Sequence, residues 1–158
     1  MNQGDLKIRP ARVEDASMIT ECVAAAYRHY IIRLGKPPGP MLNDYGKMIQ
    51  QHRVFVLTDG ARILGVLVLI RQNRSLLVDN VAVHPDYQGR GLGRKLMALA
   101  EEEARSLRFP AVTLYTNERM TENIDLYKKL GYTETARKTE QGYQRVYMQK
   151  SLLSDETG

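Results

Sequence analysis

Residues 81–96 read Val-Ala-Val-His-Pro-Asp-Tyr-Gln-Gly-Arg-Gly-Leu-Gly-Arg-Lys-Leu, a pattern that predicts an apolar strand, a turn, a glycine-rich loop and an amphipathic helix. Gly89, Gly91 and Gly93 have no Cβ, so the backbone there can adopt left-handed conformations and approach a ligand closely. The first N–H groups of the helix have no partner within it, and the helix dipole favours negative charge. The stretch therefore predicts a site for a phosphate-bearing cofactor, with backbone groups as donors.

Two common phosphate-binding patterns do not fit this loop. The dinucleotide fingerprint G-x-G-x-x-G would require a third glycine at position 94 or 96, and these positions hold Arg94 and Leu96. The P-loop pattern G-x-x-x-x-G-K-[ST] is absent from the sequence.

The spacing Gln88-x-x-Gly91-x-Gly93, after a strand, resembles motif A of the GCN5-related N-acetyltransferases, the GNAT superfamily. Two further stretches strengthen the resemblance. Residues 8–11, Ile-Arg-Pro-Ala, match the signature of the superfamily's first strand. Residues 123–132 resemble its motif B. Asn123 and Tyr127 are four residues apart and lie on one face of a helix, Gly131 suits a helix C-cap, and Tyr132 closes the motif. The resemblance covers most of residues 6–150.

Composition indicates one globular domain. Of 158 residues, 43% are hydrophobic and 26% are charged, so we expect a single domain over residues 1–153 and a disordered tail over 154–158. The longest apolar run, 63–70, is too short to span a bilayer. The N-terminus lacks the apolar segment of a secretory signal, and the single cysteine, Cys22, excludes an internal disulfide. We therefore expect a cytoplasmic protein with no membrane partner.

The net charge of +5 raises the question of nucleic acid binding. The sequence contains no arginine-rich run and no basic stripe with interleaved aromatic residues, so we expect no nucleic-acid partner. No cluster of histidine, cysteine and acidic residues predicts a metal site.

Hydrophobic periodicity predicts a mixed α/β fold. The pattern indicates a first strand at 6–9, a helix over about 16–34, a shorter helix at 42–51, strands at 53–58, 62–71 and 76–83, a helix after the glycine loop, a strand at 112–115, a helix near 123–130 and a final strand pair. The resemblance implies the GNAT fold: a central, mostly antiparallel, twisted sheet of six to seven strands flanked by about four helices.

The resemblance also implies a function, acetyl-CoA-dependent transfer of an acetyl group directly to a primary amine of a small molecule or peptide. It assigns cofactor binding to residues of the glycine loop, the preceding strand and motif B, namely Val81, Ala82, Val83, Gln88, Gly89, Arg90, Gly91, Leu92, Gly93, Arg94, Asn123 and Tyr127. In the superfamily, a main-chain N–H near Val83 serves the thioester carbonyl oxygen, and the motif B tyrosine, here Tyr127, protonates the departing thiolate.

The general base is less determined by the sequence. An alkylamine is only about 0.1% neutral near pH 7.4, a cost of roughly 4 kcal/mol that a base or a desolvating pocket must offset. In the histone-acetylating branch of the superfamily, a glutamate on the strand before the glycine loop is the base. The matching position in this sequence holds Leu77. Glu118 is the carboxylate named as a candidate base. Asp79-Asn80 could also act, either group could work directly or through water, and an ordered chain of water molecules is favoured over Glu118.

The acceptor is not named by the sequence. The resemblance implies that Tyr30, Arg33 and Tyr45 line the acceptor pocket, and Arg33 or Lys36 would suit a carboxylate on the acceptor. A homodimer is expected by resemblance alone. The alternative function is a noncatalytic acyl-CoA-binding or regulatory domain that keeps the cofactor loop without turnover.

Overall fold

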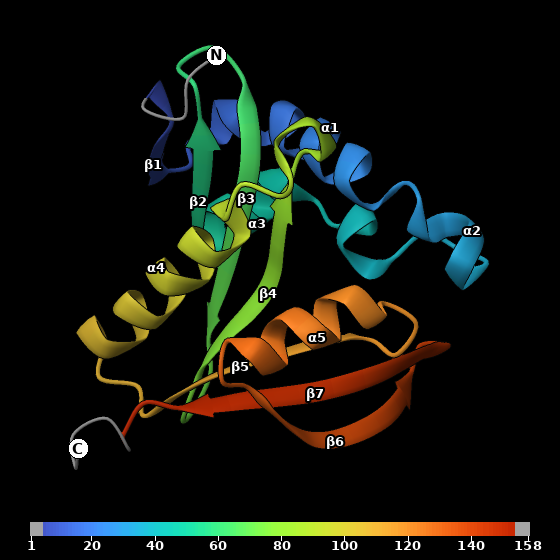
Figure 1. The fold of residues 1–158 in the computed structure, drawn as a ribbon. Coiled ribbons are helices and arrows are strands. Elements are labelled where there is room, and N and C mark those ends of the chain that lie inside the picture. Colours follow the sequence, from blue (N-terminus) through green and yellow to red (C-terminus); the bar gives the residue numbers. More distant parts are fainter. Residues whose placement is uncertain (1–4, 154–158) are drawn as a thin grey trace.

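Seven strands form one sheet in the order β1-β2-β3-β4-β5-β7-β6 (Figure 1). The computed structural model describes residues 5–153, so the tail that we expected to be disordered lies outside the described residues. The strands are β1 (Lys7–Pro10), β2 (Arg53–Thr58), β3 (Ile63–Arg71), β4 (Leu76–Val83), β5 (Ala111–Asn117), β6 (Thr133–Glu140) and β7 (Tyr143–Ser151). All neighbouring strands are antiparallel except β4 and β5, which confirms the expected fold class.

The α-helices among the described residues are α1 (Ala16–Tyr27), α2 (Tyr30–Leu34), α3 (Tyr45–Gln51), α4 (Leu92–Ser106) and α5 (Thr121–Lys129). Short 3-10 turns lie at η2 (Val13–Asp15), η3 (Gly39–Leu42) and η4 (Pro85–Tyr87).

The prediction of one continuous helix over 16–34 was wrong. The N–H of Ile31 donates to the carbonyl of Arg28, three residues back, at 3.2 Å. A bond over three residues belongs to a 3-10 turn rather than to an α-helix, and it interrupts the α-helical pattern between α1 and α2. The next helix also begins later than expected, at Tyr45, because Asp44 caps it by accepting from the N–H of Lys47 at 3.2 Å.

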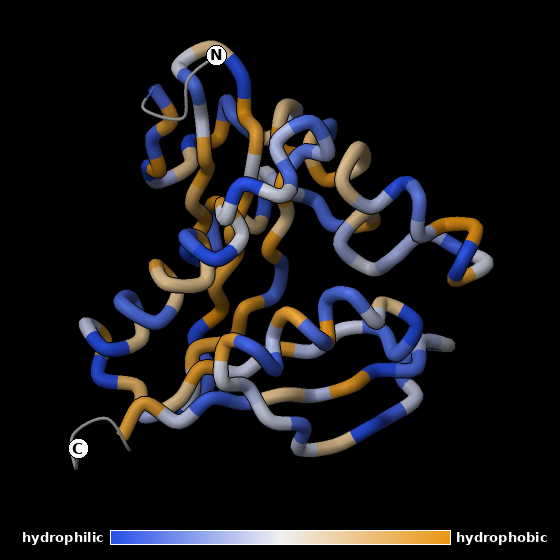
Figure 2. Tube along the Cα trace, in the orientation of Figure 1, coloured by the Kyte–Doolittle hydropathy of each residue, from blue (hydrophilic) through white to orange (hydrophobic). Residues whose placement is uncertain are grey.

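Helices cover both faces of the sheet, and the alternation of side chains along the strands supplies a core for each (Figure 1). On β3, Leu67 and Leu69 pack with residues of α4 and α5, whereas Val66 and Val68 pack with residues of α1. Figure 2 shows apolar residues gathered along the central strands, while the edge strand β6 is mostly pale or polar. Among residues 5–153, no helix is both long and apolar enough to cross a membrane.

A β-bulge changes which residues of β4 face each side. Val68 pairs with Asn80 and Leu69 pairs with Val78, so Asp79 is the extra residue on β4. Val78 belongs to the core beneath α4 and α5, but Asn80 bonds to Tyr27 of α1 on the opposite face. In a regular strand, residues 78 and 80 would point to the same face of the sheet, because side chains alternate between faces. The bulge therefore reverses which face of the sheet the later side chains of β4 occupy.

The parallel contact between β4 and β5 is short. It includes only the pairs Leu76↔Val112, Leu77↔Thr113 and Val78↔Leu114, although both strands continue beyond it. From residue 79 onward the two strands separate, and β5 continues with β7 and β6 as a second half of the sheet (Figure 1). The sheet is thus split at its centre, where the glycine loop follows the end of β4.

Candidate active site

The split in the sheet lies beside two adjoining cavities, each of about 390 Å³. We call the one beside the glycine loop the loop cavity and the one between β4, β5 and β7 the sheet cavity. Both volumes lie in the range of small-molecule sites.

The loop cavity is formed by the elements that the sequence predicted for the cofactor. Of the twelve residues expected to bind it, only Arg90 is absent from the described lining. The lining also includes residues that the sequence did not single out for the cofactor, among them Ala26, Tyr27, His29, Tyr87 and Met97. Arg90 lies next to this loop, where its guanidinium sits 4.8 Å from the centroid of the Tyr87 ring.

Two of the three loop glycines adopt left-handed backbone conformations, and the third does not. Gly89 has φ +80° and Gly91 has φ +76°, conformations that other residues rarely adopt. Gly93 has no such angle, and a Cβ built on it would meet no atom of residues 5–153 within 4 Å outside its own turn of helix. The packing of the described residues therefore does not require glycine at position 93, and the open space there is available to a ligand.

Helix α4 begins at this loop. Its N-cap is Gly91, and the N–H of Lys95 is already bonded to the carbonyl of Gly91 at 3.2 Å, so the amide groups of the first turn precede it. These donors and the positive end of the helix dipole point toward the loop, and Arg94 lines the same cavity. The arrangement is suited to a phosphate group.

The open edge of β4 offers backbone groups to the same region. The hydroxyl of Tyr27 donates to the carbonyl of Val81 at 3.0 Å, and Nε2 of Gln88 donates to the carbonyl of Val83 at 3.0 Å. In an antiparallel strand, the N–H and C=O of one residue point to the same edge. The N–H groups of Val81 and Val83 therefore point to the edge that β5 has left.

The sheet cavity contains charged groups of both signs. Its described lining includes one carboxylate, Asp79, and one guanidinium, Arg145, among polar and aromatic side chains such as Tyr115 and Tyr143. Asp79 is half-buried and accepts from the Tyr115 hydroxyl at 3.4 Å and from Nδ2 of Asn43 at 3.5 Å. Burial raises the pKa of Asp79, while these donors and the charges of His52 and Arg145 lower it by less.

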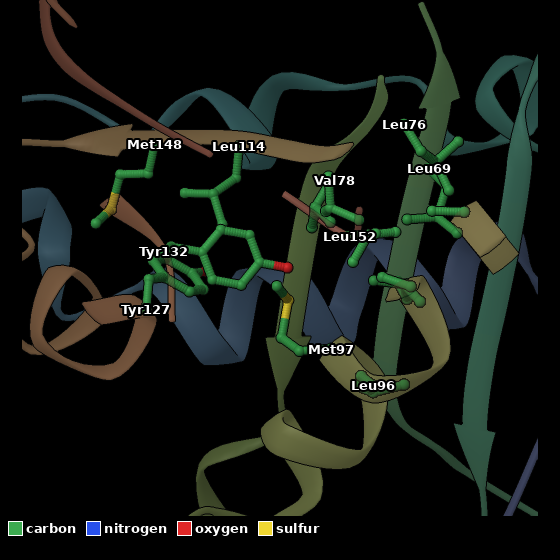
Figure 3. Packing of buried hydrophobic residues seen from close by; sticks show 14 of the residues in the cluster. Leu69, Leu76, Val78, Leu96, Met97, Leu114, Tyr127, Tyr132, Met148 and Leu152 are labelled. Carbon is green, nitrogen blue, oxygen red and sulfur yellow. The ribbon is translucent and has the colours of Figure 1, made fainter. Parts of the chain in front are cut away.

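Among residues 5–153, four line both cavities: Tyr27, Val81, Asn123 and Tyr127. Tyr127 is only 7% exposed, and its ring packs against Tyr132 within the core shown in Figure 3. Burial raises its pKa, so the phenol keeps its proton. Within residues 5–153 its hydroxyl makes no hydrogen bond, and it is therefore available to a ligand at the junction of the cavities.

Glu118, the carboxylate that the sequence favoured as base, lies elsewhere. It lines neither cavity, and its carboxylate is 3.5 Å from the guanidinium of Arg137 on β6. The carboxylate that lines the sheet cavity is Asp79. The bulge on β4 places it at the cavity wall two residues after Leu77, and sequence spacing gives no direct signal of this.

The three residues expected in the acceptor pocket are also distributed differently. Arg33 lines neither cavity and donates to Glu122 at 2.6 Å, which holds the pKa of that carboxyl at about 2. Tyr30 lines the loop cavity and donates to Glu122 at 3.2 Å. Both residues thus connect α2 to α5.

Tyr45 is fully buried and lies behind the sheet cavity. Its hydroxyl donates to the carbonyl of Pro40 at 2.6 Å and accepts from Nδ2 of Asn80 at 3.0 Å. It orients the residue next to Asp79. The basic residue that does line this cavity, Arg145, was not identified from the sequence, because it lies in the last strand, remote from every motif.

Nucleophilic cysteine chemistry has no support in this site. Cys22 is 2% exposed, and burial raises the pKa of its thiol to about 12. The residues that the structure describes include no group of histidine, cysteine and acidic side chains that could hold a metal ion.

Comparison with known proteins agrees with this geometry. Residues 50–134 match the family described as acetyltransferase (GNAT) domain, and this match includes the glycine loop and motif B. The chain belongs to the GNAT acetyltransferase family. It is also similar to the L-amino acid N-acyltransferase MnaT of Escherichia coli K12, with 33% identity over 69 residues. That match covers 44% of this chain and 40% of MnaT, so the chain spans less than half the length of this curated relative.

Solved structures of GNAT proteins share the fold over nearly the whole chain. The PaiA N-acetyltransferase of Thermoplasma acidophilum, in complex with coenzyme A, aligns with a TM-score of 0.76 and 14% identity over 92% of this chain and 98% of its own. The ribosomal-protein-S18-alanine N-acetyltransferase of E. coli aligns with a TM-score of 0.75 and 20% identity over 93% and 94%. At these identities the likeness shows the fold alone.

Proposed function

We propose that this GNAT protein is an acetyl-CoA-dependent N-acetyltransferase that transfers the acetyl group directly to a primary amine of a small molecule or peptide. The observation that carries the proposal is the shared wall of the two cavities, formed by Val81, Asn123, Tyr127 and Tyr27. A cofactor bound at the glycine loop and an amine bound between the sheet halves would meet there.

The loop cavity suits coenzyme A. Gly89 and Gly91 give the loop its left-handed turns, the first turn of α4 supplies amide donors, and Gly93 leaves room for a phosphate group. The coenzyme A in the PaiA structure and the acyltransferase activity in the name of MnaT support the same cofactor. Acetyl-CoA, when bound, supplies an acetyl thioester whose carbonyl carbon accepts the amine and whose sulfur departs.

Asp79 takes the proton from the amine in this proposal. It is the one carboxylate in the described lining of the sheet cavity, and burial raises its pKa toward the working range of a general base. Its bonds to Tyr115 and Asn43 hold the carboxylate in place. Asp79 therefore replaces Glu118 as the proposed base.

Two groups at or next to the shared wall act on the thioester, the first of them in the loop cavity. The N–H of Val83, with that of Val81, points to the open edge of β4 and is suited to bind the carbonyl oxygen as negative charge develops on it. Burial raises the pKa of Tyr127, so its phenol keeps the proton at Oη and can donate a hydrogen bond to the departing sulfur. Neither role needs a covalent acyl-enzyme.

A noncatalytic acyl-CoA-binding domain is the alternative from a different class. It needs the loop cavity but has no use for a half-buried carboxylate and a second cavity across the same wall, so the enzyme is favoured. The cytoplasmic location and the homodimer stay predictions from the sequence.

The test is calorimetric titration with acetyl-CoA, followed by thiol release with a panel of amines. The proposal expects micromolar binding and release with at least one class of amine. Binding without release from any amine would favour the noncatalytic alternative, and no binding would overturn the cofactor assignment.

A further inference from the structure

The two charged side chains that line the sheet cavity, Asp79 and Arg145, have different hydrogen-bond partners. Asp79 is bonded to neutral donors, the Tyr115 hydroxyl and the Asn43 amide. Among the described residues, Arg145 on β7 makes one long ion pair, from Nη1 to Oε1 of Glu140 at 3.4 Å, and also hydrogen-bonds to the Tyr147 hydroxyl. The side chain of Glu140 is 39% exposed and accepts in addition from the hydroxyl of Tyr147. Glu140 is therefore shared and lies outside the cavity lining.

Arg145 is held rigidly at the cavity wall. Its side chain is only 18% exposed, and its guanidinium lies 4.4 Å from the centroid of the Tyr115 ring and 5.8 Å from that of Tyr143. Stacking on aromatic faces fixes the plane of the guanidinium. A fixed planar guanidinium binds a carboxylate with two parallel hydrogen bonds at little entropic cost.

Tyr115 connects this cation to the proposed base. Its ring lies against Arg145 and its hydroxyl bonds to Asp79, so one phenol group separates the guanidinium from the carboxylate. A compact molecule with an amine at one end and an anion at the other would match both charges. A simple alkylamine would leave Arg145 without a ligand.

One side of the sheet cavity is closed by contacts between distant segments. The hydroxyl of Tyr143 donates to the carbonyl of Pro37 at 2.6 Å, and Nζ of Lys36 donates to the carbonyl of Gly142 at 2.7 Å. These bonds join the loop after α2 to the turn between β6 and β7. Both segments contribute to the cavity lining, so the closure limits the room for a polypeptide.

We infer that the acceptor is a small primary amine that carries a carboxylate, such as an amino acid, and that Arg145 binds this carboxylate while Asp79 faces the amine. The inference rests on the proposed function and assigns its substrate class. The sequence suggested Arg33 or Lys36 for this carboxylate, but Arg33 is bonded to Glu122 and Lys36 to the carbonyl of Gly142. The inference assigns the carboxylate to Arg145 instead.

The experiment compares thiol release for amino acids, for their carboxamides and for carboxylate-free amines of similar size. For the wild-type protein, kcat/KM for the preferred amino acid should exceed that for its amide by about 10- to 100-fold, the range expected for hydrogen bonds to a charged group. This comparison needs no variant, so it does not depend on any substitution folding correctly.

Two substitutions at Arg145 test the residue itself. Arg145→Gln should raise KM for the amino acid by a similar factor, change kcat little and leave the amide unaffected, while Arg145→Lys should recover part of the loss. Arg53→Gln is the matched control, because Arg53 pairs with Glu103 at 2.8 Å on another part of the sheet and lines neither cavity. This control should keep the acid-to-amide ratio of the wild type.

The outcomes separate the two claims. Faster release with carboxylate-free amines, or an Arg145→Gln variant that slows acid and amide equally, would overturn the carboxylate assignment and leave the acetyltransferase intact. Thiol release with no amine of any class would overturn the proposed function and the substrate class with it.

Discussion

The hydroxyl of Tyr115 on β5 donates to Oδ1 of Asp79 on β4 at 3.4 Å, one residue beyond the last pair of the parallel ladder, Val78↔Leu114. A side-chain bond thus spans the place where backbone pairing stops. The carboxylate at this place is half-buried, in a cavity, with a pKa raised by burial. We therefore expect the ionised carboxylate of residue 79 to serve the reaction and to lower the stability of the fold.

Asp79→Asn is expected to lower kcat/KM by about 100-fold, because the amide cannot accept the amine proton. The wild-type rate should rise with pH through the pKa of Asp79, since only the deprotonated form is a base, and the variant should lack this acidic limb. The measurement is the pH profile of thiol release. Glu118→Gln provides the comparison, and a larger loss in that variant would return the base to Glu118.

The same Asp79→Asn substitution should raise the melting temperature near pH 7. Where a carboxyl has a higher pKa in the folded state than in the unfolded state, its ionisation opposes folding, so the free energy of unfolding falls as pH rises through these values. Removing the charge removes that cost. A melting temperature below that of the wild type, measured by circular dichroism at neutral pH, would contradict this reasoning.

Tyr127→Phe should reduce kcat by about 100-fold while the dissociation constant of coenzyme A stays within about threefold. The ring remains in the core, and only the hydroxyl at the junction of the cavities is lost. Tyr132→Phe is the matched control, because Tyr132 is also a buried core tyrosine but its hydroxyl donates to Glu101 at 3.3 Å, outside both cavities. Equal losses of kcat in the two variants would argue against a specific role for Tyr127.

Gly93→Ala should affect stability and cofactor binding in opposite directions. Position 93 lies in the first turn of α4, and a Cβ there meets no atom within 4 Å in the part of the chain that the structure describes, apart from its own helix turn. Alanine should therefore stabilise the helix by about 0.5–1 kcal/mol. Its methyl group occupies space left for the cofactor, and we expect about tenfold weaker coenzyme A binding by calorimetry. Gly91→Ala, at φ +76°, should instead lower stability. Unchanged affinity in Gly93→Ala would show that the cofactor does not pack against this residue.

Asp15→Asn should destabilise the fold by about 2 kcal/mol at pH 7. The Asp15 carboxylate accepts from the Arg9 guanidinium at 2.8 and 3.1 Å and from the N–H of Arg12 at 2.7 Å. The Arg9 hydrogen bond holds the pKa of Asp15 below its usual range, so this stabilisation is present above about pH 4 and is lost as pH falls through the folded value. Urea unfolding at pH 7 and at pH 3 measures the effect, and the variant should approach the wild type at the lower pH.

The sequence by itself determined the features that depend on local chemistry. The glycine spacing at Gly89, Gly91 and Gly93 predicted the loop and the start of α4, because left-handed turns and a helix N-terminus are encoded over a few residues. Alternating and helical periodicity predicted the strands and the fold class in the same way. Even the expected motif B pair, Asn123 and Tyr127, lies where a helix of that register places it, on the wall of the loop cavity.

Only the tertiary structure decided which groups meet. A one-residue bulge at Asp79 and a parallel ladder that stops at Val78 together set the sheet cavity, and both depend on pairing between segments far apart in the chain. Arg145 reaches this cavity because β7 lies next to β5 in the sheet. The Glu118 carboxylate, one residue beyond the end of β5, instead lies 3.5 Å from the guanidinium of Arg137 on β6. Periodicity reports which face a residue occupies along one strand, whereas register and the point of strand separation arise only when the strands pair.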